Sequence, residues 1–165
     1  MKVYIDCDGV ILDTETNLFD RYYELKKNNP ELSRREYIAT LNWREWLYES
    51  GDINEALRLL KFYGPRSADI LTKVYSYEEG KEKIIFFREN GVYNNIVLVP
   101  GDLRKNDVVL AYDSVLVDDN IKNLDSWDAV GGHSIYFGEQ ELIYPRIETL
   151  DEVLDPVKVK KLLKR

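Results

Sequence analysis

The chain opens with MKVYIDCDGV, residues 1–10, in which an apolar strand leads into two acidic residues, Asp6 and Asp8, and then Gly9. Residues two apart in a strand point to the same side, so these carboxylates can converge on one metal ion or one phosphate. Gly9 allows a sharp backbone turn that brings amide groups close to an anion. The stretch therefore predicts a phosphoryl-transfer site at the carboxyl end of the first strand.

The length and composition indicate a single globular unit. The 165 residues suffice for one domain with a sizeable apolar core, or for a small core with an inserted lid. Hydrophobic residues make up 44% of the chain and charged residues 32%, and no run of about 18 apolar residues predicts a membrane span. The start lacks the pattern of a secretory leader, so we expect a cytoplasmic protein. The single cysteine, Cys7, excludes an internal disulfide, and we expect it to pack in the core rather than act as a nucleophile.

The charge of the chain limits its partners. The formal net charge is −7, which opposes binding to a nucleic acid polymer or an anionic membrane, because both favour a basic face. It does not exclude a small phosphorylated substrate, since one Mg²⁺ ion and one or two lysines reverse the potential locally. The sequence does not indicate an oligomeric state.

Five short runs rich in β-branched residues predict a buried parallel sheet. They are residues 2–5, 69–71, 96–99, 114–117 and 134–137. Each is almost continuously apolar and is followed by polar or glycine residues, which is typical of strands buried on both faces. Helical patterns lie between them, at residues 78–90 before Gly91 and at 123–130. The pattern favours an α/β fold with a Rossmann-like parallel sheet of about five strands.

The interval between the first two predicted strands is longer than one crossover helix requires. Its apolar residues recur at helical spacing, so we expect a small helical cap at residues 14–66, inserted into a core made of 1–13 and 67–165. Aromatic cap residues can stack on a nucleobase or pack the helices, and packing is the favoured interpretation. These aromatic residues are Tyr37, Trp43, Trp46 and Tyr48. Residues 150–165 predict a final helix, or a turn and a helix, packed on the sheet.

Polar side chains come at or beyond the ends of the first four predicted strands. In chain order they are Asp6 with Asp8, Thr72, Lys105, and Asp118 with Asp119. Because ligands of open α/β sheets bind outside the carboxyl ends of the strands, we expect these groups to meet in one crevice. Each residue type suits a separate task in phosphoryl transfer.

The carboxylates fit the roles of nucleophile, acid/base and metal ligand. Asp6 is placed to attack phosphorus and form an aspartyl phosphate. Asp8 would protonate the leaving oxygen and later take a proton from the attacking water. Oxygen atoms of Asp6 and Asp118 and the backbone carbonyl of Asp8 would bind Mg²⁺, a cation that prefers such hard ligands. Without a cation these carboxylates would repel one another, so the cluster itself predicts a metal.

The remaining groups fit the transferred phosphate. Lys105 would offset the negative charge on the nucleophile and on the phosphoryl group, while Thr72 and the amide of Lys73 would hydrogen-bond the phosphate oxygens. Asp119 would orient Lys105 or a metal-bound water.

Four motifs in order resemble those of the haloacid dehalogenase superfamily. They are DCDGVILDT at residues 6–14, ILT at 70–72, Lys105, and VDDN at 117–120. The resemblance implies that Asp6 is the nucleophile, that Asp8 is the acid/base, and that Asp118 and Asp119 bind Mg²⁺. It also implies a phosphatase or phosphomutase rather than a dehalogenase, since dehalogenating members lack the second aspartate. Within the superfamily, NLDSW at 123–127 and GGHSIYF at 131–137 look like the deoxyribonucleotidase-like branch.

These observations predict a Mg²⁺-dependent phosphomonoesterase that acts on a small phosphorylated metabolite, with a nucleoside 5′-monophosphate as the first choice. A sugar phosphomutase of the same superfamily and a non-catalytic phosphate-binding regulatory protein on the same scaffold are the alternatives. A receiver domain is disfavoured, because it would carry its acceptor aspartate after a middle strand and would lack the helical insertion.

Overall fold

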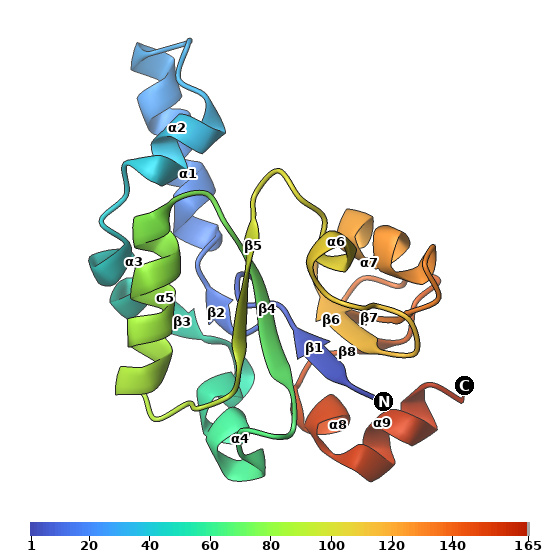
Figure 1. Ribbon diagram of the computed structural model, residues 1–165. Helices are drawn as coiled ribbons and strands as arrows, with labels where there is room; N and C mark the ends of the chain where they lie inside the picture. Colours follow the sequence, from blue (N-terminus) through green and yellow to red (C-terminus); the bar gives the residue numbers. More distant parts are fainter. Residues whose placement is uncertain (165) are drawn as a thin grey trace.

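The computed structural model describes residues 1–164, and its centre is a six-stranded sheet in the order β5-β4-β1-β6-β7-β8 (Figure 1). All five pairings in this sheet are parallel. The strands are β1 (Val3–Ile5), β4 (Asp69–Val74), β5 (Ile96–Pro100), β6 (Val115–Asp118), β7 (His133–Phe137) and β8 (Arg146–Ile147). The predicted α/β fold is confirmed, and each of the five expected strands is present. The sixth, β8, was not expected, because two residues are too short to form a sequence pattern.

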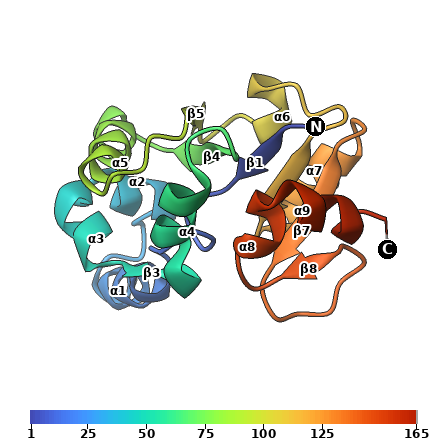
Figure 2. The same ribbon diagram turned by 90° about the horizontal axis from the view of Figure 1, so that it is seen from below.

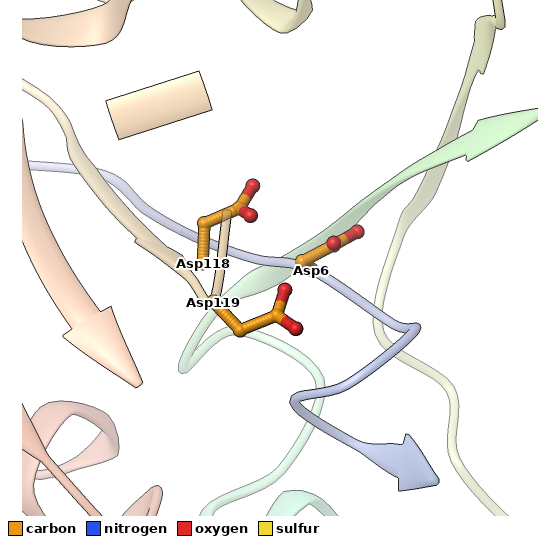
Figure 3. A group of neighbouring side chains, drawn as sticks. All are labelled: Asp6, Asp118 and Asp119. Atoms are coloured by element: carbon orange, nitrogen blue, oxygen red, sulfur yellow. The ribbon is translucent and has the colours of Figure 1, made fainter. Parts of the chain in front are cut away.

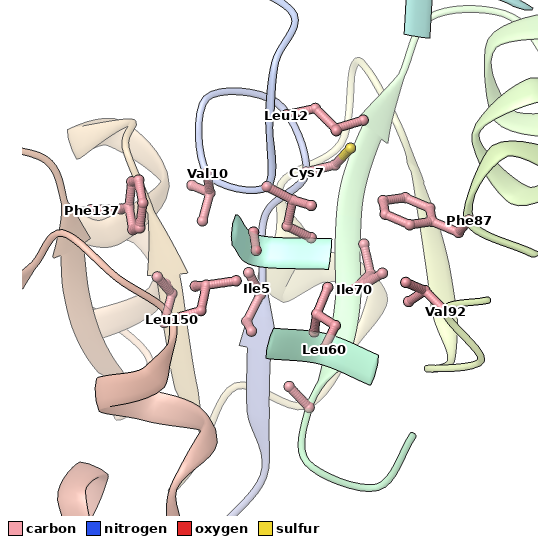
Figure 4. Packing of buried hydrophobic residues seen from close by; sticks show 14 of the residues in the cluster. Ile5, Cys7, Val10, Leu12, Leu60, Ile70, Phe87, Val92, Phe137 and Leu150 are labelled. Atoms are coloured by element: carbon pink, nitrogen blue, oxygen red, sulfur yellow. The ribbon is translucent and has the colours of Figure 1, made fainter. Parts of the chain in front are cut away.

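The sheet is buried on both faces, which explains its apolar sequence. Alternate residues of β1 face opposite layers, so Ile5 joins one cluster of buried residues and Tyr4 joins the other. The larger cluster combines Ile5 with Ile70 of β4, Leu60 and Phe87 (Figure 4). Full burial of each such side chain contributes about 1.5–3 kcal/mol. This packing stabilises β1 at the middle of the sheet.

Helices cover both faces. One layer includes α5 (Tyr77–Glu89), α8 (Asp151–Leu154) and α9 (Pro156–Leu162), and the other is built around α7 (Ile121–Asp128). The short α6 (Lys105–Val108) precedes β6. The two helices predicted at 78–90 and 123–130 correspond to α5 and α7. The predicted C-terminal helix appears as the pair α8 and α9, and Arg165 lies outside the described residues.

The segment between β1 and β4 is mainly helical. It contains α1 (Thr16–Asn28), α2 (Arg34–Ala39), α3 (Trp43–Glu49), the 3₁₀ turn η1 (Ile53–Glu55) and α4 (Ala56–Tyr63). It also holds an unexpected antiparallel pair, β2 (Leu12–Asp13) and β3 (Gly51–Asp52). A Ser33–Glu36 capping box starts α2, and the Asn42 side chain caps α3. These local signals break the insertion into short helices.

The helices of the insertion occupy two places. In Figure 1, α1 and α2 lie beyond the end of the sheet where β4 finishes, whereas α4 lies at the opposite end. There α4 packs beside α8 (Figure 2), and Leu60 of α4 joins the core with Ile5 and Ile70. The division of the chain at residues 14–66 stays a prediction, because α3 packs against α5 and α4 packs against α8, so the segment and the rest of the chain share one buried cluster.

Within residues 1–164, none of the helices is both long and apolar enough to pass through a lipid bilayer.

Candidate active site

Asp6 follows β1 directly and begins a tight turn. Its backbone N–H donates to the carbonyl of Val117 in β6 at 2.9 Å, which continues the strand pairing. The Cys7 N–H donates to Asp6 Oδ1 at 2.8 Å and so fixes the carboxylate. The carbonyl of Cys7 accepts from the amides of Ile11 and Leu12 at 2.9 and 3.0 Å, so the chain coils back on itself. The buried Cys7 thus has a packing role, as expected.

Gly9 meets two requirements of this turn. Its φ is +77°, in the region that side chains rarely adopt. A Cβ atom at this position would also lie 2.2 Å from Oδ2 of Asp119. The absence of a side chain therefore lets the first turn approach the acidic residues that follow β6.

Three carboxyl groups gather where β1 and β6 end (Figure 3). Asp6, Asp118 and Asp119 each offer an oxygen atom, and these three atoms lie within 4.8 Å of one another. Asp118 is the last residue of β6 and is fully buried, whereas Asp119 is partly exposed and lines a cavity. The predicted convergence of the first and last motifs is therefore present in the structure.

Lys105 neutralises part of this cluster. It is the first residue of α6 and is 1% exposed, and its Nζ lies 2.8 Å from Asp6 Oδ1 and 2.6 Å from Asp118 Oδ2. Asp118 also accepts from the amide of Asn120 and the side chain of Asn123. The sequence predicts that Asp119 orients Lys105 or a metal-bound water, but in the structure Lys105 contacts Asp6 and Asp118 instead. Both oxygens of Asp118 are thus engaged by protein donors.

The electrostatics of this cluster favour an added cation. Burial raises the pKa of Asp6 well above its usual range, and the charges of Asp118 and Asp8 raise it further against the opposing effect of Lys105. Burial and the charge of Asp118 raise the pKa of Asp119 to about 7. For Lys105, the carboxylates of Asp118 and Asp6 outweigh burial and raise the pKa. One ammonium group does not balance three carboxylates, and this all-oxygen donor set fits a hard divalent cation such as Mg²⁺.

Asp8 belongs to a second cluster beside the first. Its Oδ1 accepts from the Thr14 hydroxyl at 2.7 Å, and its Oδ2 accepts from the Thr72 hydroxyl at 3.3 Å and from Lys83 Nζ at 2.6 Å. Burial alone would raise the pKa of Asp8, but the charge of Lys83 and these hydrogen bonds outweigh it and lower the pKa. The side chain of Asp8 therefore faces Lys83, outside the trio of carboxyl groups.

Thr72 lies inside β4 rather than after it. The strand continues to Val74, three residues beyond the predicted end, because Thr72, Lys73 and Val74 pair with Leu98, Val99 and Pro100 of β5. The alternation of the strand still turns the buried Thr72 hydroxyl toward Asp8. Lys73 lines the cavity next to it.

Lys83 and Glu79, which no sequence motif marks, complete the second cluster. Both belong to α5, where they form an i,i+4 ion pair of 2.9 Å with side chains 0% and 3% exposed. The charges of Asp8 and Glu79 outweigh burial and raise the pKa of Lys83, while burial raises the pKa of Glu79. Burying a charge costs several kcal/mol unless it is paired. The i,i+4 spacing was visible in the sequence, but it usually marks an exposed helix face.

A cavity of about 490 Å³ opens onto both clusters. It is lined by Asp6, Asp8 and Asp119 and by Lys73 and Tyr75. Residues from the segment between β1 and β4 also line it: Glu15, Leu18, Arg34, Ile38 and Trp43. The volume is that of an ordinary small-molecule site.

The cap aromatics mainly pack the helices, as expected. Tyr37, Trp43 and Trp46 are buried, whereas Tyr48 is half exposed and donates a hydrogen bond to Glu89. Of these four, Trp43 also lines the cavity.

No protein-family model and no curated protein matches the sequence, but solved structures share its fold. A subfamily IA hydrolase of the HAD superfamily from Geobacter sulfurreducens aligns with a TM-score of 0.60 and 18% identity, covering 93% of this chain and 98% of that one. A haloacid dehalogenase-like hydrolase from Streptococcus pneumoniae gives 0.63 and 14%, covering 93% and 96%. A HAD-superfamily hydrolase from Ehrlichia chaffeensis gives 0.58 and 13%, covering 98% and 96%. The chain therefore has the Rossmann-like α/β fold of HAD-superfamily hydrolases.

Proposed function

We propose that the chain is a Mg²⁺-dependent phosphomonoesterase that forms an aspartyl phosphate on Asp6. One observation carries this proposal: the buried Asp6 carboxylate opens onto a cavity while Lys105 and two further aspartates surround it. Asp8 stands two residues away, held by donors of its own. The hydrolase fold of the structural neighbours agrees with this chemistry.

In the first step, Asp6 attacks the phosphorus atom of the substrate. Both Lys105 and the Cys7 amide donate to Oδ1 of Asp6, so we assign the attack to Oδ2. As the new bond between Oδ2 and phosphorus forms, the bond to the leaving oxygen breaks, and that oxygen takes a proton from Asp8. Because its lowered pKa leaves Asp8 ionised in the free site, Asp8 first accepts this proton from the monoanion of the phosphate ester. Thr72 and Lys105 hydrogen-bond the transferred phosphoryl group, and Lys73 beside Thr72 supplies a further donor.

In the second step, water attacks the phosphorus atom of the aspartyl phosphate. Asp8 accepts the proton of this water, inorganic phosphate leaves, and Asp6 returns to its free carboxylate. Asp6 and Asp119, with Asp118 and the backbone carbonyl of Asp8, are the groups we assign to Mg²⁺. A cation bound there would supply positive charge for the approaching phosphate.

The proposed substrate is a small monoester that the cap can enclose, and a nucleoside 5′-monophosphate is the first candidate. Tyr75, 39% exposed, lines the cavity and offers an aromatic face to a base, whereas the 4% exposed Trp43 is largely covered. Arg34 and Lys122 also line the cavity and are placed to contact polar groups of the leaving moiety. Because residues of the predicted cap line the cavity beside Asp6, the proposal favours small metabolites over phosphoproteins.

The test is release of inorganic phosphate from nucleotides, sugar phosphates and other small monoesters, measured with Mg²⁺ and again with a chelator. We expect Mg²⁺-dependent release from at least one monoester. The matched control is Asp6→Asn, in which release should disappear. Transfer of phosphate between positions of a sugar, with little free phosphate, would replace the proposal with a phosphomutase. Binding of beryllofluoride without turnover of any monoester would replace it with a phosphate-binding regulatory protein.

A further inference from the structure

Lys83 occupies a place that links the acid/base candidate to the phosphate-binding candidate. Its Nζ lies 2.6 Å from Asp8 Oδ2 and donates to Thr72 Oγ1 at 3.0 Å. Two more acceptors, Glu79 Oε1 at 2.9 Å and the Lys73 carbonyl at 3.2 Å, complete its surroundings. One ammonium group thus contacts residues from the first turn, from β4 and from α5.

The surroundings of Lys83 limit its motion. Its side chain is 0% exposed, and the ring of Trp43, from α3 of the cap, lies over Nζ with its centroid 5.5 Å away. Glu79 is held in turn by the amide of Tyr75, which donates to its second oxygen at 2.7 Å. An ammonium group fixed in this way holds two of its four acceptors, Asp8 and Thr72, in a constant arrangement.

The hydrogen-bond directions matter for the reaction. Because Lys83 donates to the oxygen of the Thr72 hydroxyl, the hydroxyl proton stays available to Asp8 or to a phosphate oxygen. Lys83 and Thr14 bind different oxygens of Asp8 and so fix the plane of its carboxylate. A core position with a purely structural task would be filled equally well by an apolar side chain.

We propose that Lys83 is a positioning residue: it fixes the Asp8 carboxylate and the Thr72 hydroxyl relative to each other, so that proton transfer to the leaving group depends on it. The inference rests on the proposed phosphomonoesterase function. It assigns Lys83 no contact with the reacting atoms, since it acts through Asp8.

The experiment compares two leaving groups in single turnovers with excess enzyme. Nitrophenolate leaves without a proton, whereas an alkoxide needs one. In Lys83→Met, release of an alcohol from an alkyl phosphate should slow by about 10²-fold, the lower end of the usual effect of acid/base catalysis. Release of nitrophenolate from p-nitrophenyl phosphate should change by less than about 3-fold on the same reasoning. The enzyme concentration that gives half the maximal rate should rise for both substrates. The reason is that Thr72, which we expect to bind the phosphate, no longer accepts a hydrogen bond from Lys83.

Two further variants keep the result interpretable. Lys81→Met changes an exposed lysine of the same helix, whose charge pairs with Glu78 at the surface, and should leave both rates unchanged. The double variant Glu79→Gln with Lys83→Met removes the buried carboxylate that Lys83→Met would leave unpaired, and it should show the same split between leaving groups if the single variant does not fold.

Three outcomes decide the matter. A selective loss with the alkyl phosphate supports the positioning role. An equal loss with both substrates, or no loss with either, overturns it, because a structural role would not distinguish the leaving groups. If the unmodified protein turns over no monoester, the proposed function itself has failed, and that result precedes any comparison of variants.

Discussion

The candidate site has two halves, and each is organised around one buried lysine, Lys105 in one half and Lys83 in the other. Each ammonium group bridges two carboxyl groups at 2.6–2.9 Å, and each side chain is at most 1% exposed. The Lys105 half contains Asp6, Asp118 and Asp119, and the Lys83 half contains Asp8 and Glu79. Asp6 and Asp8 share the first turn, but the lysines come from different helices, Lys105 from α6 and Lys83 from α5.

The halves differ in how completely the protein satisfies them. On the Lys83 side, hydroxyl groups of Thr14 and Thr72 add to the ammonium group, and the pKa of Asp8 is lowered even though burial opposes this. On the Lys105 side, burial and the neighbouring carboxylates raise the pKa of Asp6 and bring that of Asp119 to about 7. One half is complete as folded, and the other gains stability from an added cation. This difference separates the group that we expect to move protons from the groups that we expect to hold metal and phosphate.

The largest effect should come from the Lys105 half. Asp6→Asn removes the nucleophile, and we expect turnover to be lost, because an amide cannot form the aspartyl phosphate. The Asn oxygen can still accept from Lys105 and from the Cys7 amide, so the melting temperature should stay close to that of the parent. Phosphate release and thermal unfolding measure the two expectations. Substantial turnover by a folded variant would remove the covalent step from the mechanism.

The matching substitution in the Lys83 half should lower turnover by less. Asp8→Asn keeps an oxygen that can accept from Lys83 but loses the ability to exchange a proton, so we expect turnover to fall by about 10²- to 10⁴-fold. Rapid-quench measurement of the phosphoenzyme separates slow leaving-group departure from slow hydrolysis. If the rate of turnover is unchanged, another group carries the proton.

The features that the sequence could predict are those with a repeated local signal. Mainly apolar runs of three or four residues marked five strands, and Gly91 marked the end of α5. The order of Asp6, Thr72, Lys105 and Asp118 along successive strands placed them together, because parallel strands end at one edge. The strand register brings Asp6 and Asp118 to the same level of the sheet, because the pairing of β1 with β6 aligns Ile5 with Val117.

The features that the sequence could not predict depend on distance in three dimensions. Lys83 is 75 residues from Asp8 and lies in a charged segment that reads as an exposed helix face. Its burial follows from the packing of α3 against α5, which covers Nζ with Trp43. The choice between Asp118 and Asp119 as the partner of Lys105 also has no sequence signal, because it depends on which carboxylate the strand turns inward.

A third change tests whether metal binding belongs to the Lys105 half alone. Asp119→Asn should weaken Mg²⁺ binding by at least about 10-fold, the scale seen even when groups behind the ligands are changed. Glu79→Gln is the control in the other half, and its Mg²⁺ affinity should match that of the parent. Isothermal titration calorimetry provides both values. Equal weakening in the two variants would mean that the halves are not independent.

The smallest expected effect is a pH dependence of the stabilisation by Mg²⁺. The pKa of Asp119 is about 7 in the folded chain and about 3.9 in an unfolded one. Between these two pH values Asp119 holds a proton in the folded state that it has lost in the unfolded state. The protonation of Asp119 therefore contributes to the free energy of unfolding fully below about pH 4, and this contribution is lost as the pH rises through 7. A cation that replaces this proton stabilises the fold mainly above pH 7, where the carboxylate is already ionised.

We therefore expect saturating Mg²⁺ to raise the melting temperature by more at pH 8 than at pH 6, by a few degrees, since about 1 kcal/mol corresponds to about 2–4 °C in a chain of this size. In Asp119→Asn the difference between the two pH values should shrink, because the residue that exchanges a proton for the cation is gone. In Glu79→Gln it should persist, since that carboxyl pairs with Lys83 rather than with the metal groups. A Mg²⁺ shift that is equal at both pH values in the parent protein would show that Asp119 is already ionised at pH 6, and the contrast between a complete half and a half that needs a cation would fail.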